Sequence, residues 1–238
     1  MTGNRDSMIR GILFDIGDTL IAATALHKKA LEAAAKSSTW LKDANAFIRA
    51  YSQADGLIES KNIPDLNHLY SDRRIVQLAF ESLNWDFPED KAGQFVHLYR
   101  RELRKRIRPK PSLHRVLKAL KRKRILLGIA SNGTTREQNE QLDRLHIKEF
   151  FDPIIVSEAA GVRKPDPAIL LIAKRQWKIK PGEILVLGDR PDWECLAAAR
   201  AGMKRGLTTQ FVDHSASITP ETQPDVVIKR FEDLLDLF

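Results

Sequence analysis

Short apolar runs recur along the chain and predict buried β-strands, because each is brief, rich in leucine or β-branched residues, and bounded by turn or helix-start signals. Segments with apolar residues at helical spacing separate the later runs, and Gly202 follows the last segment as a left-handed helix cap. This alternation predicts an α/β fold, a Rossmann-like parallel sheet with helices on both faces. The predicted strands are residues 9–14, 125–130, 154–156, 184–187 and 226–228, and the helices between them are residues 136–145, 168–177 and 193–201.

The first strand is followed by about 90 residues in which the apolar spacing is helical throughout. Ligands of parallel α/β sheets bind beyond the carboxyl ends of the strands, which is where this segment leaves the sheet. We therefore predict an all-helical cap domain over residues 21–110. Residues 8–20 and 111–238 then form the core domain, and Pro109 and Pro111 mark the return to it.

Composition limits the class of protein. A chain of 238 residues with 43% hydrophobic residues can bury a substantial core. Its longest apolar runs have six residues, against the ~18 needed to cross a bilayer, so we expect no membrane span. The N-terminus lacks a secretion signal, and the single cysteine, Cys195, can form neither an internal disulfide nor a thiolate zinc cluster. We expect a cytoplasmic protein.

The net charge of +8 comes from one segment. Residues 100–124 hold 13 Lys or Arg and one acid, a balance of +12, so the other 213 residues carry a net charge of −4. Apolar residues at helical spacing, interrupted by Pro109 and Pro111, predict two amphipathic helices here. Solvated basic faces beside a domain junction are the favoured interpretation, because no aromatic residue interleaves as a stacking platform for nucleic acid requires. Nucleic-acid binding remains the alternative.

Polar residues stand directly after the predicted strands, at positions where a buried strand does not require them. Asp15 follows the first strand, and Ser131, Asn132 and Gly133 follow the second. Each group alone is explained as a turn or a helix cap. The remaining polar residues are Lys164, stiffened by a following proline beyond the third strand, and Asp189, Asp192 and Glu194 after the fourth.

Together these residues match the needs of phosphoryl transfer through a covalent intermediate. Asp15 is ionised at neutral pH and can attack phosphorus without a base. Its charge repels the phosphate, so a divalent cation and a lysine are needed, and oxygen ligands select Mg²⁺. Asp15 and Asp189 can hold the ion, and Lys164 offsets the remaining charge. Ser131, the Asn132 amide and backbone N–H groups can hold the phosphoryl oxygens.

The order of FDIGDTL, ASNG, GVRKPDP and LGDRPDWECLAAARAGM resembles the four motifs of the haloacid dehalogenase (HAD) superfamily. The resemblance implies that Asp15 is the nucleophile, that Asp15, the Gly17 carbonyl and Asp189 bind Mg²⁺, and that Lys164 neutralises charge. It also implies that Ser131, Asn132 and Gly133 bind the phosphate. The helical cap resembles the family's small bundle that opens and closes over the site.

Two positions depart from the family pattern. Phosphatases of this family carry a second aspartate two residues after the nucleophile as the general acid and base, but this chain has Gly17 there, and Asp18 follows. Asp18 is the candidate replacement. Glu194 stands where a second aspartate is frequent, so it and Asp192 are further candidates for the metal. We assign the neighbouring Trp193 to packing.

The sequence thus predicts a Mg²⁺-dependent phosphatase of a small soluble phosphomonoester. Two alternatives remain, a 2-haloacid dehalogenase and a low-activity HAD-fold protein that binds a phosphorylated ligand or nucleic acid. The substrate and the oligomeric state are not predicted. Basic and aromatic residues of the cap are candidates for substrate contact, namely His27, Lys28, Lys29, Tyr70, Arg73 and Arg74.

Overall fold

The computed structural model describes residues 8–60 and 72–238, which divide into two compact units. Within the described ranges one unit combines residues 8–22 with residues 109–238, and the other holds residues 23–60 and 72–108. The candidate Tyr70 lies outside the described residues. No helix within the described ranges is long and apolar enough to cross a membrane.

The first unit is built on a sheet of parallel strands in the order β3-β2-β1-β4-β5-β6. The central strand β1 pairs with β2 through Phe14 and Ile129, and with β4 through Phe14 and Leu187. The carboxyl ends of β1, β2 and β4 therefore meet at one edge of the sheet. The strands are β1 (Gly11–Phe14), β2 (Leu126–Ser131), β3 (Ile154–Val156), β4 (Ile184–Gly188), β5 (Lys204–Thr208) and β6 (Val226–Ile228).

The five predicted strands are confirmed within two residues at each end, but β5 was not predicted. Its sequence KRGLT begins with two cations and a glycine, so it has no apolar run. Lys204 and Arg205 are only partly buried because they stand at the beginning of the strand, whereas Gly206, Leu207 and Thr208 are buried. Pairing with β4 on one side and β6 on the other determines this strand rather than its hydrophobicity.

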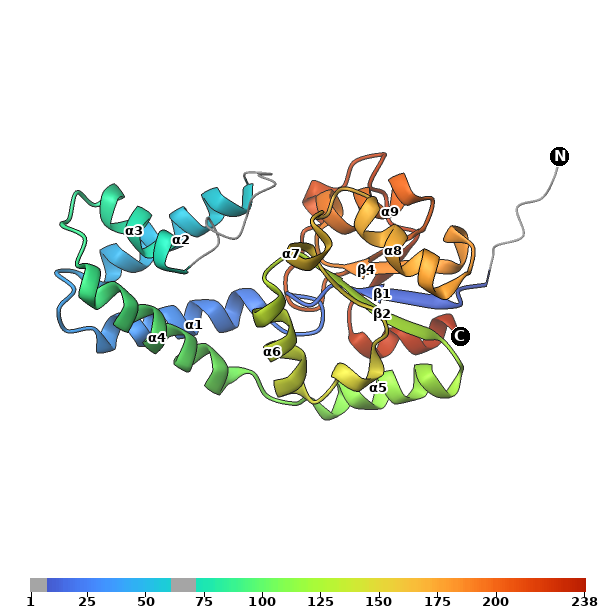
Figure 1. The fold of residues 1–238 in the computed structure, drawn as a ribbon. Helices are drawn as coiled ribbons and strands as arrows, with labels where there is room; N and C mark the ends of the chain where they lie inside the picture. The colour runs from blue at the N-terminus through green and yellow to red at the C-terminus, as the bar shows by residue number, and fades with distance from the viewer. Residues whose placement is uncertain (1–7, 61–71) are drawn as a thin grey trace. The chain divides into compact units, whose positions relative to one another are not determined.

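Helices cover both faces of the sheet, as predicted, with α8 and α9 on one face and α5 on the other (Figure 1). The α8 and α9 side of the core contains the buried Leu13, Ile169, Leu170 and Val186. The α-helices of this unit are α5 (Pro111–Arg122), α6 (Thr135–Leu145), α7 (Ser157–Ala160), α8 (Ala168–Trp177) and α9 (Leu196–Ala201). The shorter turns are η1 (Lys148–Phe150), η2 (Pro181–Glu183), η3 (Pro191–Cys195), η4 (Ser215–Ser217) and η5 (Phe231–Leu237).

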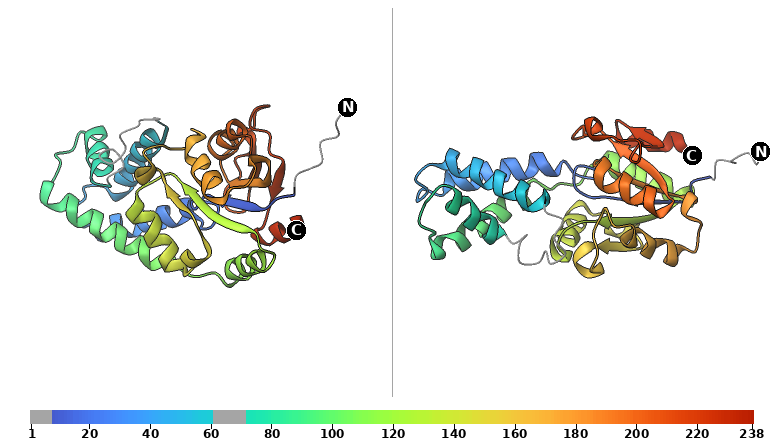
Figure 2. Two further views of the ribbon diagram at one scale, coloured as in Figure 1. Left: turned by 45° about the vertical axis from the view of Figure 1, so that its right-hand side comes forward. Right: turned by 90° about the horizontal axis from the view of Figure 1, so that it is seen from above.

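The second unit is helical in all of its described elements, as the apolar spacing predicts. Its helices are α1 (Ala23–Ser37), α2 (Ala44–Ser60), α3 (Asp72–Ser82) and α4 (Glu89–Arg106). Helix α1 packs against α4 and α2 packs against α3 (Figure 2). The core of the unit is an aromatic cluster that includes Phe47, Phe80, Phe95 and Tyr99.

The basic segment forms two helices, as predicted. Helix α4 ends at Arg106 in the second unit, and α5 begins at Pro111 in the first. On α5 the residues Leu113, Val116, Leu117 and Leu120 are buried. The cations of this helix consequently face solvent.

Candidate active site

Asp15 is placed by the central strand of the sheet. It follows β1 directly, and its N–H donates to the Leu187 carbonyl of β4 at 2.9 Å. The next residues turn tightly, since the N–H groups of Leu20 and Ile21 both donate to the Ile16 carbonyl. This turn holds the Asp15 carboxylate at the carboxyl edge of the sheet, where it is 8% exposed.

Lys164 lies between two carboxylates. Its Nζ is 2.6 Å from Asp15 Oδ1 and 2.6 Å from Glu194 Oε1, and its side chain is fully buried. Ser131, at the end of β2, donates from Oγ to the same Asp15 Oδ1 at 3.0 Å. The structure thus brings Ser131 and Lys164 to Asp15, from which they are 116 and 149 residues away in the sequence.

Asn132 and Gly133 make different contacts from those expected of phosphate ligands. The Asn132 amide clamps the backbone of Lys164, because its Oδ1 accepts from the Lys164 N–H at 2.9 Å and its Nδ2 donates to the Lys164 carbonyl at 3.1 Å. The Gly133 N–H donates to Ser157 Oγ at 3.0 Å. Both groups are engaged within the protein, since the lysine loop and the turn after β2 need these bonds to hold their positions.

Glu194 reaches Lys164 through a π-helical turn, η3, that follows β4. Its Oε2 accepts from the Arg190 N–H at 3.0 Å, while Oε1 contacts the lysine. A Cβ at Gly188 would lie 2.1 Å from Glu194 Cγ, so the glycine leaves the room that this side chain occupies. Glu194 is a candidate for the metal from its place in the sequence, and its carboxylate pairs with Lys164.

Asp189 and Asp18 lie in the same electrostatic neighbourhood as Asp15. Burial, followed by the negative charges of Glu194, Asp15 and Asp18, raises the pKa of Asp189 to about 9. Asp18 is 7% exposed and has a left-handed backbone, with φ 46°. The candidate Asp18 is therefore part of the cluster, although it follows Gly17 instead of replacing it.

Two opposed effects act on the buried lysine. Burial lowers the pKa of Lys164, but the charges of Asp15 and Glu194 outweigh it and raise the pKa above its usual value. Burial also raises the pKa of Glu194, and Lys164 acts in the opposite direction. Lys164 thus stays protonated and holds its positive charge beside Asp15.

Trp193 is not packed in the core, contrary to our assignment. Its indole is partly exposed and lies between two guanidinium groups, with Arg190 at 4.5 Å and Arg163 at 5.4 Å from the ring centroid. Asp192 forms a bidentate pair with Arg190 at 2.8 and 3.0 Å. The carboxylate of Asp192 is therefore engaged by an arginine.

His214, which the sequence did not single out, also lies at the site. Its Nε2 is 3.4 Å from Asp189 Oδ2. It lies in the segment between β5 and η4, and β5 was not predicted, so nothing placed this histidine near the carboxyl edge of the sheet. A polar residue shortly after a parallel strand is the signal that could have found it.

The donor set fits a hard divalent cation better than a metal that needs a side-chain cluster. Lys164 pairs with Asp15 and Glu194, while Asp189 has its pKa raised by burial and then by the negative charges of Glu194, Asp15 and Asp18. Among the described residues no group of three His, Cys, Asp or Glu side chains is arranged to hold a metal by itself. Mg²⁺ is bound by one or two carboxylates and keeps several waters, which suits such a site.

The described candidates for substrate contact lie in the second unit, and three of them form bonds within it. His27 Nδ1 bonds to the Tyr99 hydroxyl, Arg73 pairs with Glu89, and Arg74 pairs with Glu81. Lys28 and Lys29 are exposed. These contacts account for His27, Arg73 and Arg74 without a substrate.

Comparison with known proteins decides the family. A sequence model described as haloacid dehalogenase-like hydrolase matches residues 9–202. The chain belongs to this family. It is 30% identical over 241 residues to the glyceraldehyde 3-phosphate phosphatase of Methanopyrus kandleri, covering 97% of both chains.

Solved structures support the same fold assignment. The HAD-hydrolase YfnB from Bacillus subtilis, bound to magnesium, superposes with a TM-score of 0.74 at 20% identity, over 97% of this chain and 99% of that one. The L-2-haloacid dehalogenase from Xanthobacter autotrophicus superposes with a TM-score of 0.68 at 18% identity, over 97% and 98%. Both likenesses concern the fold, an α/β HAD core with additional helices.

Proposed function

We propose that this HAD-family hydrolase is a Mg²⁺-dependent phosphatase of small soluble phosphomonoesters that works through an aspartyl phosphate. One observation carries the proposal: the buried Lys164 ammonium contacts the Asp15 carboxylate at 2.6 Å, beside Ser131. A nucleophile, a fixed positive charge and a hydroxyl donor thereby meet at one strand edge. Phosphoryl transfer needs positioning and charge stabilisation of this kind.

In the first step the Asp15 carboxylate attacks phosphorus, and the bond from phosphorus to the substrate's alkoxide oxygen breaks. The leaving alkoxide takes up a proton. In the second step water attacks phosphorus, which releases inorganic phosphate and regenerates the carboxylate. Lys164 and Ser131 lower the repulsion between Asp15 and the phosphoryl oxygens, because both place donors at the attacking group.

We assign the proton transfers to Asp18. It is buried in the same cluster of acids, and its left-handed backbone turns the chain directly after Gly17. A non-glycine residue in this conformation is strained by ~1–3 kcal/mol, and such strain concentrates at functional sites. The family pattern has the aspartate before the glycine, whereas this chain has Gly17 before Asp18. In this proposal the left-handed backbone at residue 18 compensates for that change of order.

Asn132 and Gly133 act as positioning residues in this proposal. The Asn132 amide fixes the Lys164 backbone on both sides, which limits where the ammonium group can lie. Gly133 ties the turn after β2 to Ser157. Ser131 is then the substrate-binding residue of the three, together with Lys164.

Asp15, Asp189 and the Gly17 carbonyl would hold the Mg²⁺ ion. Burial raises the pKa of Asp189, and the neighbouring carboxylates raise it further; this supports the assignment, because a bound cation relieves the repulsion between the carboxylates. When bound, Mg²⁺ supplies positive charge that screens the phosphate from the acids around it.

The relative from Methanopyrus kandleri is named for glyceraldehyde 3-phosphate, which supports short phosphorylated carbohydrates as first substrates for assay. We also propose a cytoplasmic location. The only cysteine, Cys195, is a buried free thiol whose pKa burial raises to about 12, so it is inert.

The test compares the release of phosphate with the release of chloride. We expect phosphate release from p-nitrophenyl phosphate and from glyceraldehyde 3-phosphate, with loss of both on adding EDTA and recovery with excess Mg²⁺. Chloride release from 2-chloropropionate, unaffected by EDTA, would instead support a dehalogenase. Neither release would support a binding protein without turnover.

A further inference from the structure

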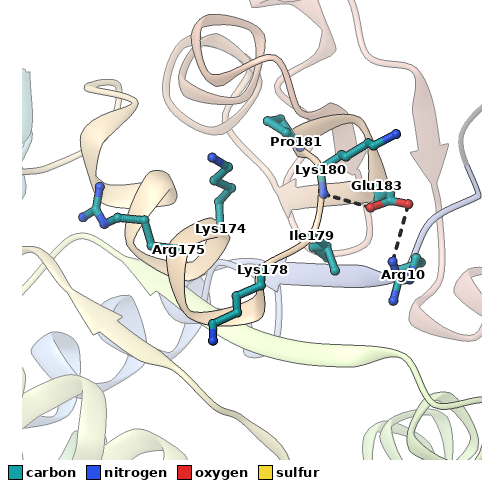
Figure 3. A pocket seen from close by; sticks show the side chains of 8 residues that line it. All are labelled: Arg10, Lys174, Arg175, Lys178, Ile179, Lys180, Pro181 and Glu183. Atoms are coloured by element: carbon teal, nitrogen blue, oxygen red, sulfur yellow. Dashed lines mark hydrogen bonds and ion pairs between the residues drawn. The ribbon is translucent and has the colours of Figure 1, made fainter.

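A basic surface lies at the amino edge of the sheet, opposite the edge that carries Asp15. It surrounds a cavity of about 560 Å³ that is lined by Arg10, Lys174, Arg175, Lys178 and Lys180, with Glu183 as the acid among them (Figure 3). We include in the surface three exposed cations, Lys121 and Arg122 in the last turn of α5 and Arg124 after it. These eight cations are called the amino-edge surface below.

The two parts of this surface are joined at the start of the central strands. The Leu126 N–H of β2 donates to the Arg10 carbonyl at 2.9 Å, and Leu126 pairs with Gly11 of β1. Arg124 precedes Leu126 by two residues, so it stands near the beginning of β1. Figure 1 shows that α5 and α8 both end at this edge.

Few acids compensate the charge of the amino-edge surface. Glu183 accepts from the Lys180 N–H at 2.8 Å and pairs with Arg10 at 3.6 Å. Asp152, at the start of β3, bonds to the Gln176 amide. Within the described ranges the cations Lys174, Arg175 and Lys178 have no ion-pair partner.

The helix dipoles do not account for so many cations. A helix carboxyl end carries about half a negative charge, which one cation complements. Three cations lie within one turn of the end of α8, namely Lys174, Arg175 and Lys178. Three more lie within one turn of the end of α5, namely Lys121, Arg122 and Arg124.

Two of these cations have a left-handed backbone. Lys178 and Arg124 occupy left-handed positions after α8 and α5, with φ 55° and φ 60°. Glycine is the residue that such positions favour, because it has no Cβ to clash. At both helix ends the chain carries a cation where glycine would be less strained.

We propose that the amino-edge surface binds the phosphate backbone of nucleic acid without sequence preference. The cations extend over two helix ends, farther than a small anion requires, and a phosphate backbone presents a matching row of charges. The cavity lining has no aromatic residue on which a base could stack, and its apolar residues are Ile179 and Pro181. A protein partner would need an apolar or aromatic anchor, which this lining does not offer.

The surface and the candidate active site occupy opposite edges of one sheet. Nucleic acid bound at the amino edge leaves the carboxyl edge open to substrate. Binding would therefore tether the hydrolase without inhibiting it, and the proposal does not depend on which phosphate ester the enzyme cleaves.

The first experiment measures the salt dependence of binding to a fluorescein-labelled DNA duplex by anisotropy, between about 50 and 200 mM salt. A protein contacting about four phosphates gives a slope of log K against log salt near −3.6. We expect the pair Lys174→Glu and Lys178→Glu to bind at least ~10-fold more weakly and to lose about two from that slope. The matched control is Lys36→Glu with Lys42→Glu, two exposed lysines at and after the end of α1, which changes the net charge equally and should bind like the wild type.

Absence of binding by the wild type at the lowest salt would overturn the proposal. Equal weakening in the control pair would also overturn it, because charge alone and not this surface would then be responsible. Two duplexes of unrelated sequence should bind equally, and a strong preference for one would contradict backbone recognition. All variants should keep wild-type phosphatase activity, which shows that they are folded.

The second experiment separates the effect of these cations on duplex binding from their effect on the stability of the fold. Lys178→Gly with Arg124→Gly relieves two left-handed positions, so we expect an unchanged or higher melting temperature together with weaker binding to the duplex. The matched control is Asn84→Gly, at another exposed left-handed position with φ 51°, which should leave binding unchanged. Wild-type binding by the double variant would contradict the proposal.

Discussion

Lys164 is the residue on which the proposed chemistry depends. A buried cation is costly unless it is paired, and this one is paired twice, with Asp15 and with Glu194. Before substrate binds, the lysine compensates the nucleophile. When a phosphate arrives, the same charge is already in place, so no reorganisation of solvent is needed.

We expect Lys164→Ala to lower kcat by about 100- to 1000-fold, because it removes a fixed donor from the phosphoryl group. Steady-state assay with p-nitrophenyl phosphate gives the measurement. Lys174→Ala, which removes a lysine from the opposite edge of the sheet, is the matched control and should retain full activity. A kcat near wild type in the Lys164 variant would show that the charge of this lysine is not used.

Asp18→Asn tests the proton-transfer role directly. The amide keeps the size of the side chain and its tolerance of a left-handed backbone, but it cannot exchange the proton. We expect kcat to fall by about 100- to 10,000-fold, less steeply for esters with a good leaving group such as p-nitrophenol. An equal loss for good and poor leaving groups would argue against Asp18 as the acid.

At the scale of elements, the end of β4 and the π-helical turn after it together determine the position of Glu194. Gly188 leaves the space into which η3 places Glu194. The turn has one more residue than an α-helical turn, and such turns are frequent at functional sites. Without this geometry the lysine would lose its second carboxylate.

Gly188→Ala should therefore disturb the site, because the new Cβ would overlap Glu194, whose side chain is fixed by Lys164 and Arg190. We expect a lower melting temperature and at least a ~10-fold loss of kcat, consistent with the cost of overpacking at ~1–3 kcal/mol. Gly93→Ala is the control, since a Cβ there meets nothing within 4 Å on the exposed face of α4, and it should stabilise the protein by ~0.5–1 kcal/mol. Comparison of thermal unfolding and turnover in the two variants decides the matter.

The elements that the sequence predicts well are those with a strong periodic pattern. The strands β1 to β4 and the helix α8 follow from their apolar residues. Strand β5 does not, because it carries Lys204 and Arg205 and is selected by its neighbours in the sheet. Because β5 was not predicted, the position of His214 near Asp189, in the segment after this strand, was not predicted either.

For the candidate site, the motifs identify which residues meet but not what each one contacts. Asp15, Ser131 and Lys164 converge as expected. The contact of Glu194 with the lysine depends on the π-helical turn, and that of Asn132 with the lysine backbone depends on the loop after α7, neither of which has a sequence pattern of its own. Trp193 is partly exposed for the same reason.

At the scale of the whole molecule, the acidic cluster links stability to pH. Asp189 has its pKa raised by burial and by Glu194, Asp15 and Asp18, from 3.8 to about 9. A carboxyl group with a raised pKa stabilises the folded state below the pKa of the unfolded chain, and this contribution is lost as pH rises through the folded pKa. The metal-free protein should thus lose stability between about pH 4 and pH 9.

We expect the melting temperature measured in EDTA to fall from pH 6 to pH 9, with a slope of at most ~1.4 kcal/mol of unfolding free energy per pH unit from this group. Saturating Mg²⁺ should reduce the fall, because the ion binds the deprotonated carboxylate of the folded protein. Asp189→Asn removes the titrating group, so its melting temperature should depend less on pH over this range. A wild-type melting temperature that rises with pH in EDTA, relative to Asp189→Asn, would contradict the clustered arrangement.

The central claim is that the side chain of Asp15 bonds covalently to phosphorus during turnover. Rapid acid quench of the enzyme with excess substrate, followed by digestion and mass spectrometry, tests it most directly. The account predicts a phosphoryl group on the peptide that contains Asp15 in the wild type and none in Asp15→Asn, which should also lose turnover by more than about 1000-fold. Turnover with the phosphoryl group on another residue, or near-normal turnover in Asp15→Asn, would contradict the account.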